Sequence, residues 1–400
     1  MLLYPPSLSV KAENLMKGIQ PAAAAGEPLS ADFKAAVADF GLRFSAVQRG
    51  EGNTLVSPLS LYLTLAMLGN GADGQTKAEF DALLGTAAEE RNPQCRTLLD
   101  RLGRETEQGR VSLAHSIWFD QSLSVNPAFL QTNADFFSAA AYRGDFDSPD
   151  TVRDINRWGK YHTDGLIPRM IDTLRGNDLP GEQTVMAVIG AVLFDQKWET
   201  PYKKADILKD QPFYTPKGEV RADYLCSKET TLIEGNGFTG FTKAYKGQDY
   251  QFVGLLPDEG TSPEALLRAL DGDAWLTLLQ GTGGAVTAYI PKFSFDARLE
   301  LQEPLSAMGL VTAFDPDRAD FRSLANVGVP LWIGDAFQQT RVELDENGTK
   351  AASITFFGMK CGNSAPPEKE VRLDRPFVYA IVHADSGLPL FIGVLRNPAA

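Results

Sequence analysis

The histidines of the chain are the first residues to test for catalytic chemistry. His115, His162 and His383 are the only three, and they lie far apart in the sequence. None lies in an HExxH pattern, and the GxSxG pattern of a serine hydrolase is absent. The glycine-rich stretch at 281–284 lacks the lysine of a phosphate-binding loop, so it predicts a turn. We therefore expect no catalytic residue, and a hydrolase has no candidate nucleophile.

The cysteines offer neither a metal site nor a complete disulfide framework. Cys95, Cys226 and Cys361 show no metal-ligand spacing, and an odd number of thiols cannot pair completely within one chain. No metal and no organic cofactor is expected. Cys361 lies in a predicted exposed loop, where we favour a small residue tolerated by loop variation over a redox switch.

A loop of small residues between two predicted strands is the strongest functional candidate. The stretch ENGTKAASIT at 346–355 lies between strand-like runs at 339–344 and 376–382. Connections within a compact domain are usually short, and a patternless loop of roughly 20 residues indicates function. At period two, one face of the loop presents small residues that a packed sheet could accept. This face consists of Thr349, Ala351, Ser353 and Thr355. The pattern predicts a loop that can become a strand.

Composition excludes several classes of partner. A net charge of −13 argues against nucleic acid or an anionic membrane surface. A hydrophobic content of 44% is enough for a sizeable core. The longest apolar run, Val185–Phe194, is far shorter than the ~20 residues that span a bilayer, so it predicts a strand buried on both faces.

The elements that position the loop follow from periodicity. Residues 1–28 predict a flexible N-terminal extension without the features of an intact secretory signal. Ser30 is a candidate N-cap for an amphipathic helix with apolar residues from 33 to 47. Further predicted helices and strands lie at 61–68, 154–161, 185–194, 250–256, 286–290 and 340–344. Because the helices do not alternate regularly with strands, we expect an α+β fold in which one domain covers 29–400.

Several segments occur in an order that one protein family shares. They are NTLVSPLSLYLTLAMLGNGADGQT at 53–76, INRWGKYHTDGLI at 155–167, AVLFDQKWETPY at 191–202, PKFSFDARLELQEPLSAMGLVTAFDPDRADF at 291–321, and RPFVYAIV with PLFIGVLRNP within 375–398. Together they resemble the serpins, a family of suicide inhibitors of proteases. The chain is similar to a bacterial-type inhibitory member. The resemblance implies three β-sheets, eight to nine helices and an exposed reactive-centre loop at 346–368. It implies a mobile hinge formed by Glu346, Gly348, Thr349, Ala351, Ala352 and Ser353.

The resemblance also implies a mechanism. A serine protease cleaves the loop and becomes attached to it as a covalent acyl-enzyme. The loop then inserts into the main sheet as a central strand and distorts the protease before the ester can hydrolyse. A monomer that can form loop–sheet polymers is the implied assembly.

Family spacing from the hinge glutamate places the cleaved bond at Gly362–Asn363. Because this loop is longer than the common form, Cys361–Gly362 and Lys360–Cys361 remain open. A small residue before the bond suits an elastase-like or subtilisin-like protease, whereas Lys360 suits a trypsin-like one. We favour the small residue.

Two further clusters follow from the resemblance. A shutter behind the opening sheet comprises Ser57, Pro58, Ser60, Gly190 and Gln338. Family members usually have asparagine and histidine at the last two positions. We expect Gln338 to reach into the space opposite Gly190 and to bond to Ser57 or to backbone. A breach, where the loop first enters the sheet, comprises Trp198 and the ion pair of Lys292 with Glu346.

The alternative function is that of a non-inhibitory serpin, a carrier or chaperone. The small inward face of the hinge favours inhibition, since charge or proline there would block insertion. The protein is expected to be secreted or at the cell surface, with a cytoplasmic location as the alternative.

Overall fold

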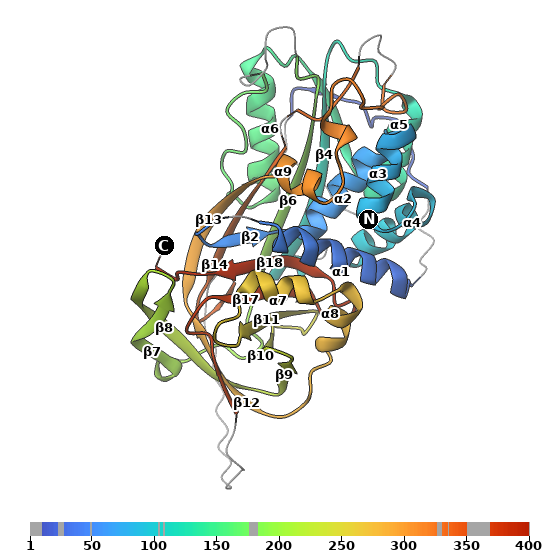
Figure 1. The fold of residues 1–400 in the computed structure, drawn as a ribbon. Helices are drawn as coiled ribbons and strands as arrows, with labels where there is room; N and C mark the ends of the chain where they lie inside the picture. The colour runs from blue at the N-terminus through green and yellow to red at the C-terminus, as the bar shows by residue number, and fades with distance from the viewer. Residues whose placement is uncertain are drawn as a thin grey trace.

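The computed structural model describes residues 10–22, 28–48, 50–102, 105–106, 109–175, 183–325, 330–334, 336–349 and 369–399. Within these residues the chain forms nine α-helices and three β-sheets, which is the α+β architecture that was predicted. Figure 1 shows one large sheet with helices gathered around its upper part and two smaller sheets below.

The predicted first helix is present. In α1 (Ala31–Ala46), the Ser30 hydroxyl accepts a hydrogen bond from the amide of Phe33, so Ser30 caps the helix as expected. The remaining helices are α2 (Pro58–Gly69), α3 (Gly74–Leu84), α4 (Ala88–Leu102), α5 (Pro127–Phe137), α6 (Pro149–His162), α7 (Pro263–Ala269), α8 (Gly272–Leu278) and α9 (Gln302–Ala307). No helix among the described residues is both long and apolar enough to cross a bilayer.

The large sheet, here called sheet A, contains the predicted strand that follows residue 185. Its order is β1 (Glu13–Asn14), β5 (Ala140–Gly144), β4 (Gly109–Asp120), β6 (Met186–Lys197), β15 (Gly348–Thr349), β14 (Phe337–Leu344) and β13 (Phe293–Glu300), with β3 (Glu105–Thr106) paired to β4. Helix α6 packs on one face of sheet A through Ile155 and Trp158.

The two smaller sheets carry the rest of the chain. Sheet B has the order β2 (Thr54–Val56), β18 (Pro389–Leu395), β17 (Phe377–His383), β11 (Tyr250–Pro257), β10 (Phe238–Ala244) and β9 (Thr231–Gly235). Sheet C has the order β16 (Lys369–Arg372), β12 (Val286–Pro291), β8 (Gly218–Glu229) and β7 (Ile207–Thr215).

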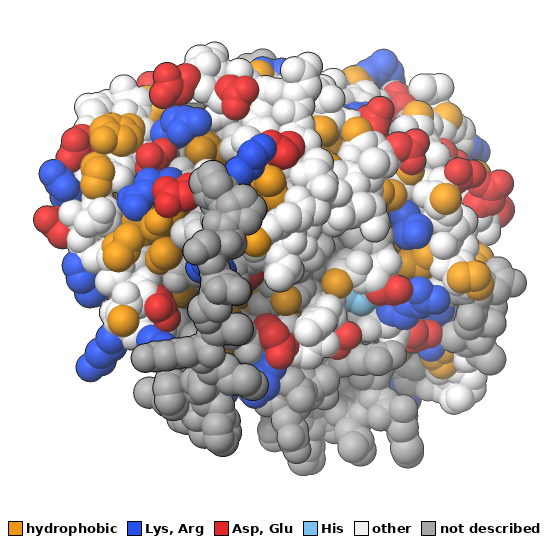
Figure 2. Space-filling view, turned by 90° about the horizontal axis from the view of Figure 1, so that it is seen from below, with side chains coloured by type: hydrophobic (Ala, Val, Ile, Leu, Met, Phe, Trp, Pro, Cys, Tyr) orange, Lys and Arg blue, Asp and Glu red, His pale blue; other side chains and the backbone are white. Residues whose placement is uncertain are grey.

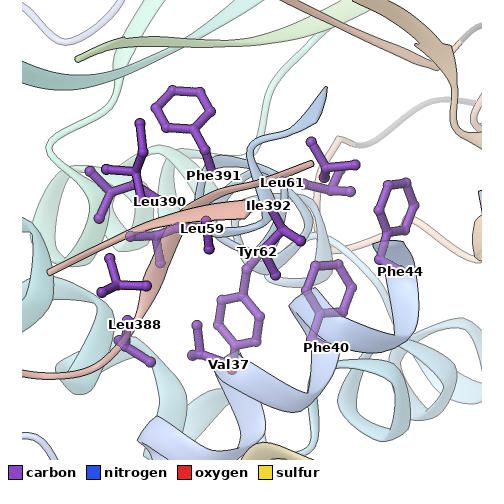
Figure 3. Packing of buried hydrophobic residues seen from close by; sticks show 14 of the residues in the cluster. Val37, Phe40, Phe44, Leu59, Leu61, Tyr62, Leu388, Leu390, Phe391 and Ile392 are labelled. Atoms are coloured by element: carbon purple, nitrogen blue, oxygen red, sulfur yellow. The ribbon is translucent and has the colours of Figure 1, made fainter. Parts of the chain in front are cut away.

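The main core joins the helices to sheet B. Figure 3 shows Phe40 of α1 and Tyr62 of α2 facing β18, and their rings meet edge to face at 5.6 Å. Phe391 of β18 points away from these helices. One continuous apolar cluster runs through elements from α1 to β18, which is the packing expected of a single domain.

The N-terminal residues differ from the prediction. Residues 10–22 are not a flexible lead-in, because β1 pairs with β5 at the edge of sheet A. The amides of Lys11 and Ala12 both donate to the Asp154 carboxylate, and Leu15, with its neighbours, packs on the core. The composition of the segment gave no periodic pattern, so these long-range contacts were not visible in the sequence.

Candidate functional site

Sheet A contains a gap between β6 and β14. Short strand β15 is the only described element between them, with Gly348 opposite Lys197, and Thr349 opposite both Gln196 and Leu344. Beyond these two residues, the described parts of β6 and β14 do not pair with each other. We call this opening the sheet A gap. The edges that line it carry backbone groups that a further strand could bind.

The gap explains why one strand is less buried than its composition suggested. Val185–Phe194 predicted a strand buried on both faces, but residues 186–190 of β6 are half-buried. The edge of β6 in this stretch faces the gap instead of a neighbouring strand. The apolar side chains of this stretch could be buried further if another strand occupied the gap.

A pocket lies at the gap, and its lining brings four of the five predicted shutter residues together. Its lining includes Gly190 of β6, Gln338 of β14, and Ser57 and Ser60 at the start of α2. Pro58 is the first residue of α2, where its missing N–H costs no helical hydrogen bond.

Gln338 fastens β14 to the start of α2. Its amide nitrogen donates to the Ser57 carbonyl at 3.0 Å, and its amide oxygen accepts from the Ser57 N–H at 2.8 Å. The Ser57 hydroxyl donates to the Leu390 carbonyl of β18. The predicted bond between Gln338 and Ser57 is therefore present, and it uses the Ser57 backbone.

The immediate neighbours of Gly190 come from α2 and β4. A Cβ atom at Gly190 would lie 2.6 Å from the Ser60 hydroxyl and 3.4 Å from the ring of His115. Ser60, Thr64 and His115 thus pack nearest to this position, and Gln338 lines the same pocket as Gly190. His115 stands opposite Gly190 on β4, and burial lowers its pKa to about 4. From the sequence alone His115 was only a core or surface residue, since its neighbours come from distant segments.

The predicted breach ion pair is also present. The Lys292 ammonium and the Glu346 carboxylate are 2.5 Å apart, and both side chains are half-buried. Hydrogen bonding to Lys292 holds the pKa of Glu346 below its ordinary value. Lys292 lies between β12 and β13, so the pair ties the hinge to the strand connection beside it.

Aromatic residues support the hinge from below. The backbone N–H of Trp198 donates to the Asn347 carbonyl at 3.0 Å, and its indole N–H donates to the Asp345 carbonyl at 2.9 Å. The Tyr202 N–H donates to the Glu346 carbonyl at 3.1 Å. Trp198, Tyr202 and Tyr245 are here called the aromatic support. The two tyrosines were missed because no local motif relates them to the hinge.

The first two hinge residues are tightly enclosed. A Cβ atom at Gly348 would lie 2.2 Å from the Gln196 carbonyl, so only glycine fits. Thr349 is 5% exposed, and its hydroxyl lies 2.8 Å from the hydroxyl of Tyr245. A small residue is thus needed where the hinge enters sheet A.

The rest of the predicted loop lies outside the described residues. This applies to the hinge residues Ala351, Ala352 and Ser353. It applies equally to the candidate cleavage residues Lys360, Cys361, Gly362 and Asn363. The described anchors of the loop are Thr349 in sheet A and Lys369, the first residue of β16 in sheet C. The loop therefore connects two different sheets.

Known proteins resemble this chain over nearly its whole length. Residues 35–398 match a family model described as "Serpin (serine protease inhibitor)". The thermophilic serpin tengpin in its native state is 32% identical, with a TM-score of 0.89, and the match covers 97% of this chain and 100% of that one. Tengpin in its latent state is 32% identical with a TM-score of 0.80, covering 93% and 99%. Plasminogen activator inhibitor 1 of Sus scrofa is 26% identical over 375 residues, covering 90% of this chain and 91% of that protein.

Proposed function

This chain belongs to the serpin family, and from that premise we propose that it inhibits a serine protease as a suicide substrate. Serpins are protease inhibitors rather than enzymes. The observation that carries the proposal is the sheet A gap, in which Gly348 and Thr349 are the described hinge residues that pair with the flanking strands. A loop with one end already in register between two unpaired edges needs only release of its other end to continue inward.

Cleavage supplies that release. The serine Oγ of the protease attacks the carbonyl carbon of the residue before the cleaved bond, and its proton passes to the base of the protease. The C–N bond then breaks, the new amine leaves with that proton, and an ester joins the loop to the enzyme. The segment that follows Thr349 can now extend between β6 and β14. At about 3.3 Å per residue, twelve residues carry the attached protease roughly 40 Å.

Two features of the described residues favour insertion. Thr349 is small and already fits beside Tyr245, and Gly348 allows close approach to Gln196. The half-buried apolar face of β6 would gain a neighbouring strand. A carrier or chaperone function does not require a sheet A gap with the hinge paired at its edge. Inhibition is therefore the better-supported function.

The favoured target is an elastase-like or subtilisin-like protease. This proposal rests on the family spacing, which puts Gly362 before the cleaved bond, and on the narrow pockets that accept small residues. A trypsin-like target would use Lys360 instead. We also propose that the protein acts outside the cell or at its surface, where such proteases are met.

Incubation with one protease of each type tests the proposal. We expect a covalent complex that survives SDS with at least one elastase-like or subtilisin-like enzyme. Mass spectrometry should show that the released fragment begins at Asn363. A fragment that begins at Cys361 would move the target to the trypsin-like class. Clean cleavage without a complex by every enzyme in the panel would refute inhibition and leave a non-inhibitory serpin.

A further inference from the structure

A buried ion pair lies beneath the aromatic support. The Lys243 ammonium of β10 and the Glu229 carboxylate at the end of β8 are 2.8 Å apart. Their side chains are 3% and 13% exposed, which is unusual because lysine and glutamate seldom lose contact with water. Replacing a buried ion pair by apolar residues often leaves stability unchanged or improved, so general stability does not account for these charges.

The lysine is enclosed by the rings that support the hinge. Its ammonium lies 4.6 Å from the centre of the Tyr202 ring and 5.5 Å from that of Trp198. A cation in this position is attracted by the electron-rich faces of both rings. The ammonium therefore fixes two of the three aromatic residues that contact the hinge.

The glutamate reaches the same aromatic support by a second route. The Ser227 hydroxyl donates to the Glu229 carboxylate at 2.6 Å, and the hydroxyls of Tyr202 and Ser227 are 3.0 Å apart. Lys243, Glu229, Ser227 and Tyr202 thus form a closed ring of contacts. The Lys243 ammonium thus contacts both Glu229 and the Tyr202 ring. The Glu229 carboxylate contacts both Lys243 and the Ser227 hydroxyl, which in turn meets Tyr202.

The backbone beside Lys243 is bonded to the breach as well. The carbonyl of Ala244 accepts from the Glu199 N–H, and the Lys246 N–H donates to the Lys197 carbonyl, at the end of β6. Between these two residues lies Tyr245, whose ring stacks on Trp198 at 4.5 Å and whose hydroxyl meets Thr349. A shift of Lys243 would therefore reach the hinge through both its side chain and its backbone.

We propose that Lys243 and Glu229 are positioning residues that hold the uncleaved hinge at Thr349, so that the loop does not enter the sheet A gap early. The delay of insertion until cleavage rests on the proposed function. The positioning of the hinge by Lys243 and Glu229 does not rest on it, because the hinge contacts exist whether or not the protein inhibits a protease. Further insertion would begin directly after Thr349, whose hydroxyl meets Tyr245 of the aromatic support, and the ion pair fixes Trp198 and Tyr202 of that support.

The physical expectation differs between single and double substitutions. Lys243→Met leaves the Glu229 carboxylate buried without its cation, and Glu229→Gln leaves the ammonium without its anion. An unpaired buried charge draws water or moves, and either response loosens the aromatic support. The double variant Lys243→Met/Glu229→Gln leaves no buried charge, so the aromatic support should largely recover.

Amide hydrogen exchange measures the contacts directly. The N–H groups of Trp198 and Tyr202 donate to the hinge carbonyls, so their exchange reports release of the hinge. In the intact protein we expect about tenfold faster exchange in each single variant and less than about threefold in the double variant. Spontaneous conversion to a loop-inserted form should likewise accelerate more in each single variant than in the double variant.

Arg175→Met is the matched control. Arg175 pairs with buried Asp120 at 3.0 Å, and Asp120 lies beside Val185 at the end of sheet A opposite the hinge. This variant should lower the melting temperature without changing exchange at Trp198 and Tyr202. Equal exchange changes in the control, or unchanged exchange in both single variants, would overturn the proposal. Failure of the parent protein to trap any protease would instead overturn the proposed function alone.

Discussion

At the scale of single residues, the contacts that hold the hinge are individually weak. Lys292 and Glu346 are each about one-third exposed, so solvent screens their attraction and the pair contributes about 1 kcal/mol or less. The bond of Thr349 to Tyr245 is enclosed but neutral. Because the hinge depends on the sum of several such contacts, losing one should change how fast the loop inserts more than whether the protein folds.

Lys292→Ala should therefore promote spontaneous insertion or polymerisation. The variant leaves Glu346 without its cation, and the hinge loses one of its ties. We expect faster appearance of loop-inserted monomers or polymers on a native gel during prolonged warming. Lys217→Ala, which removes an exposed pair with Glu51 far from the hinge, serves as the control. A Lys292→Ala protein that stays a normal monomer as long as the parent would contradict this prediction.

His115 should make stability sensitive to acid. Burial lowers its folded pKa to about 4 from an ordinary value of 6.5, so the unfolded chain binds this proton first. Stability is then lost as pH falls from about 6.5 to about 4, and between pH 7 and 5 the loss is about 2 kcal/mol. His162 has a similarly lowered pKa, from burial and from nearby Arg110.

Urea unfolding at pH 7 and pH 5 measures this effect. His115→Gln should lose less stability between these two values than the parent does. His162→Gln is the comparison variant, because His162 is less buried and lies on α6. An identical loss in His115→Gln and the parent would mean that His115 is already protonated in the fold.

The sequence predicted most of these residues but not all of their partners. Ser57, Gln338, Lys292 and Glu346 were predicted to contact one another in pairs, and they do. The resemblance to the family indicated which residues lie close together, and their side-chain chemistry indicated a hydrogen bond for one pair and an ion pair for the other. His115 was missed since its importance depends on Gly190, which lies on a different strand.

At the scale of elements, the proposed function depends on the edges of β6 and β14 that flank β15. Thr349 of β15 pairs with both neighbouring strands and Gly348 pairs with β6, and these two strands could accept a longer partner. The sequence indicated a loop able to become a strand, because its period-two face is small. It could not indicate the gap, since β6 and β14 are far apart in the chain and only the fold brings them to face each other.

Thr349→Arg tests the insertion of this element. Thr349 is 5% exposed and faces Tyr245, so an arginine there would have to bury a charge without a partner. Insertion should slow, and hydrolysis of the ester should then win. We expect at least about ten times more inhibitor to be consumed per protease molecule trapped.

Thr349→Ser is the control for this substitution, since it keeps the hydroxyl that meets Tyr245. It should inhibit nearly as well as the parent. If Thr349→Arg traps a protease with unchanged stoichiometry, the fit of residue 349 in sheet A does not limit insertion of the residues that follow it.

At the scale of the whole molecule, the proposed inhibition requires that the described fold has a lower-energy form available to it. The edges of β6 and β14 along the gap are not joined to each other, and the apolar residues of β6 beside it are half-buried. A strand inserted there would gain hydrogen bonds on both sides and bury these residues. The uncleaved loop cannot supply that strand freely, because it is anchored at Thr349 in sheet A and at Lys369 in sheet C.

Cutting the loop should consequently stabilise the protein, which is the reverse of the usual effect of a chain break. About ten inserted residues that gain about 1 kcal/mol each in hydrogen bonding would add on the order of 10 kcal/mol. For a domain of this size, that gain raises the melting temperature by more than about 10 °C. Calorimetry of intact and nicked protein measures the difference, and nicked Thr349→Arg should show a much smaller rise because its strand cannot enter fully. Equal melting temperatures of the intact and nicked parent would mean that release of the loop does not lead to formation of a stabilising strand in the gap.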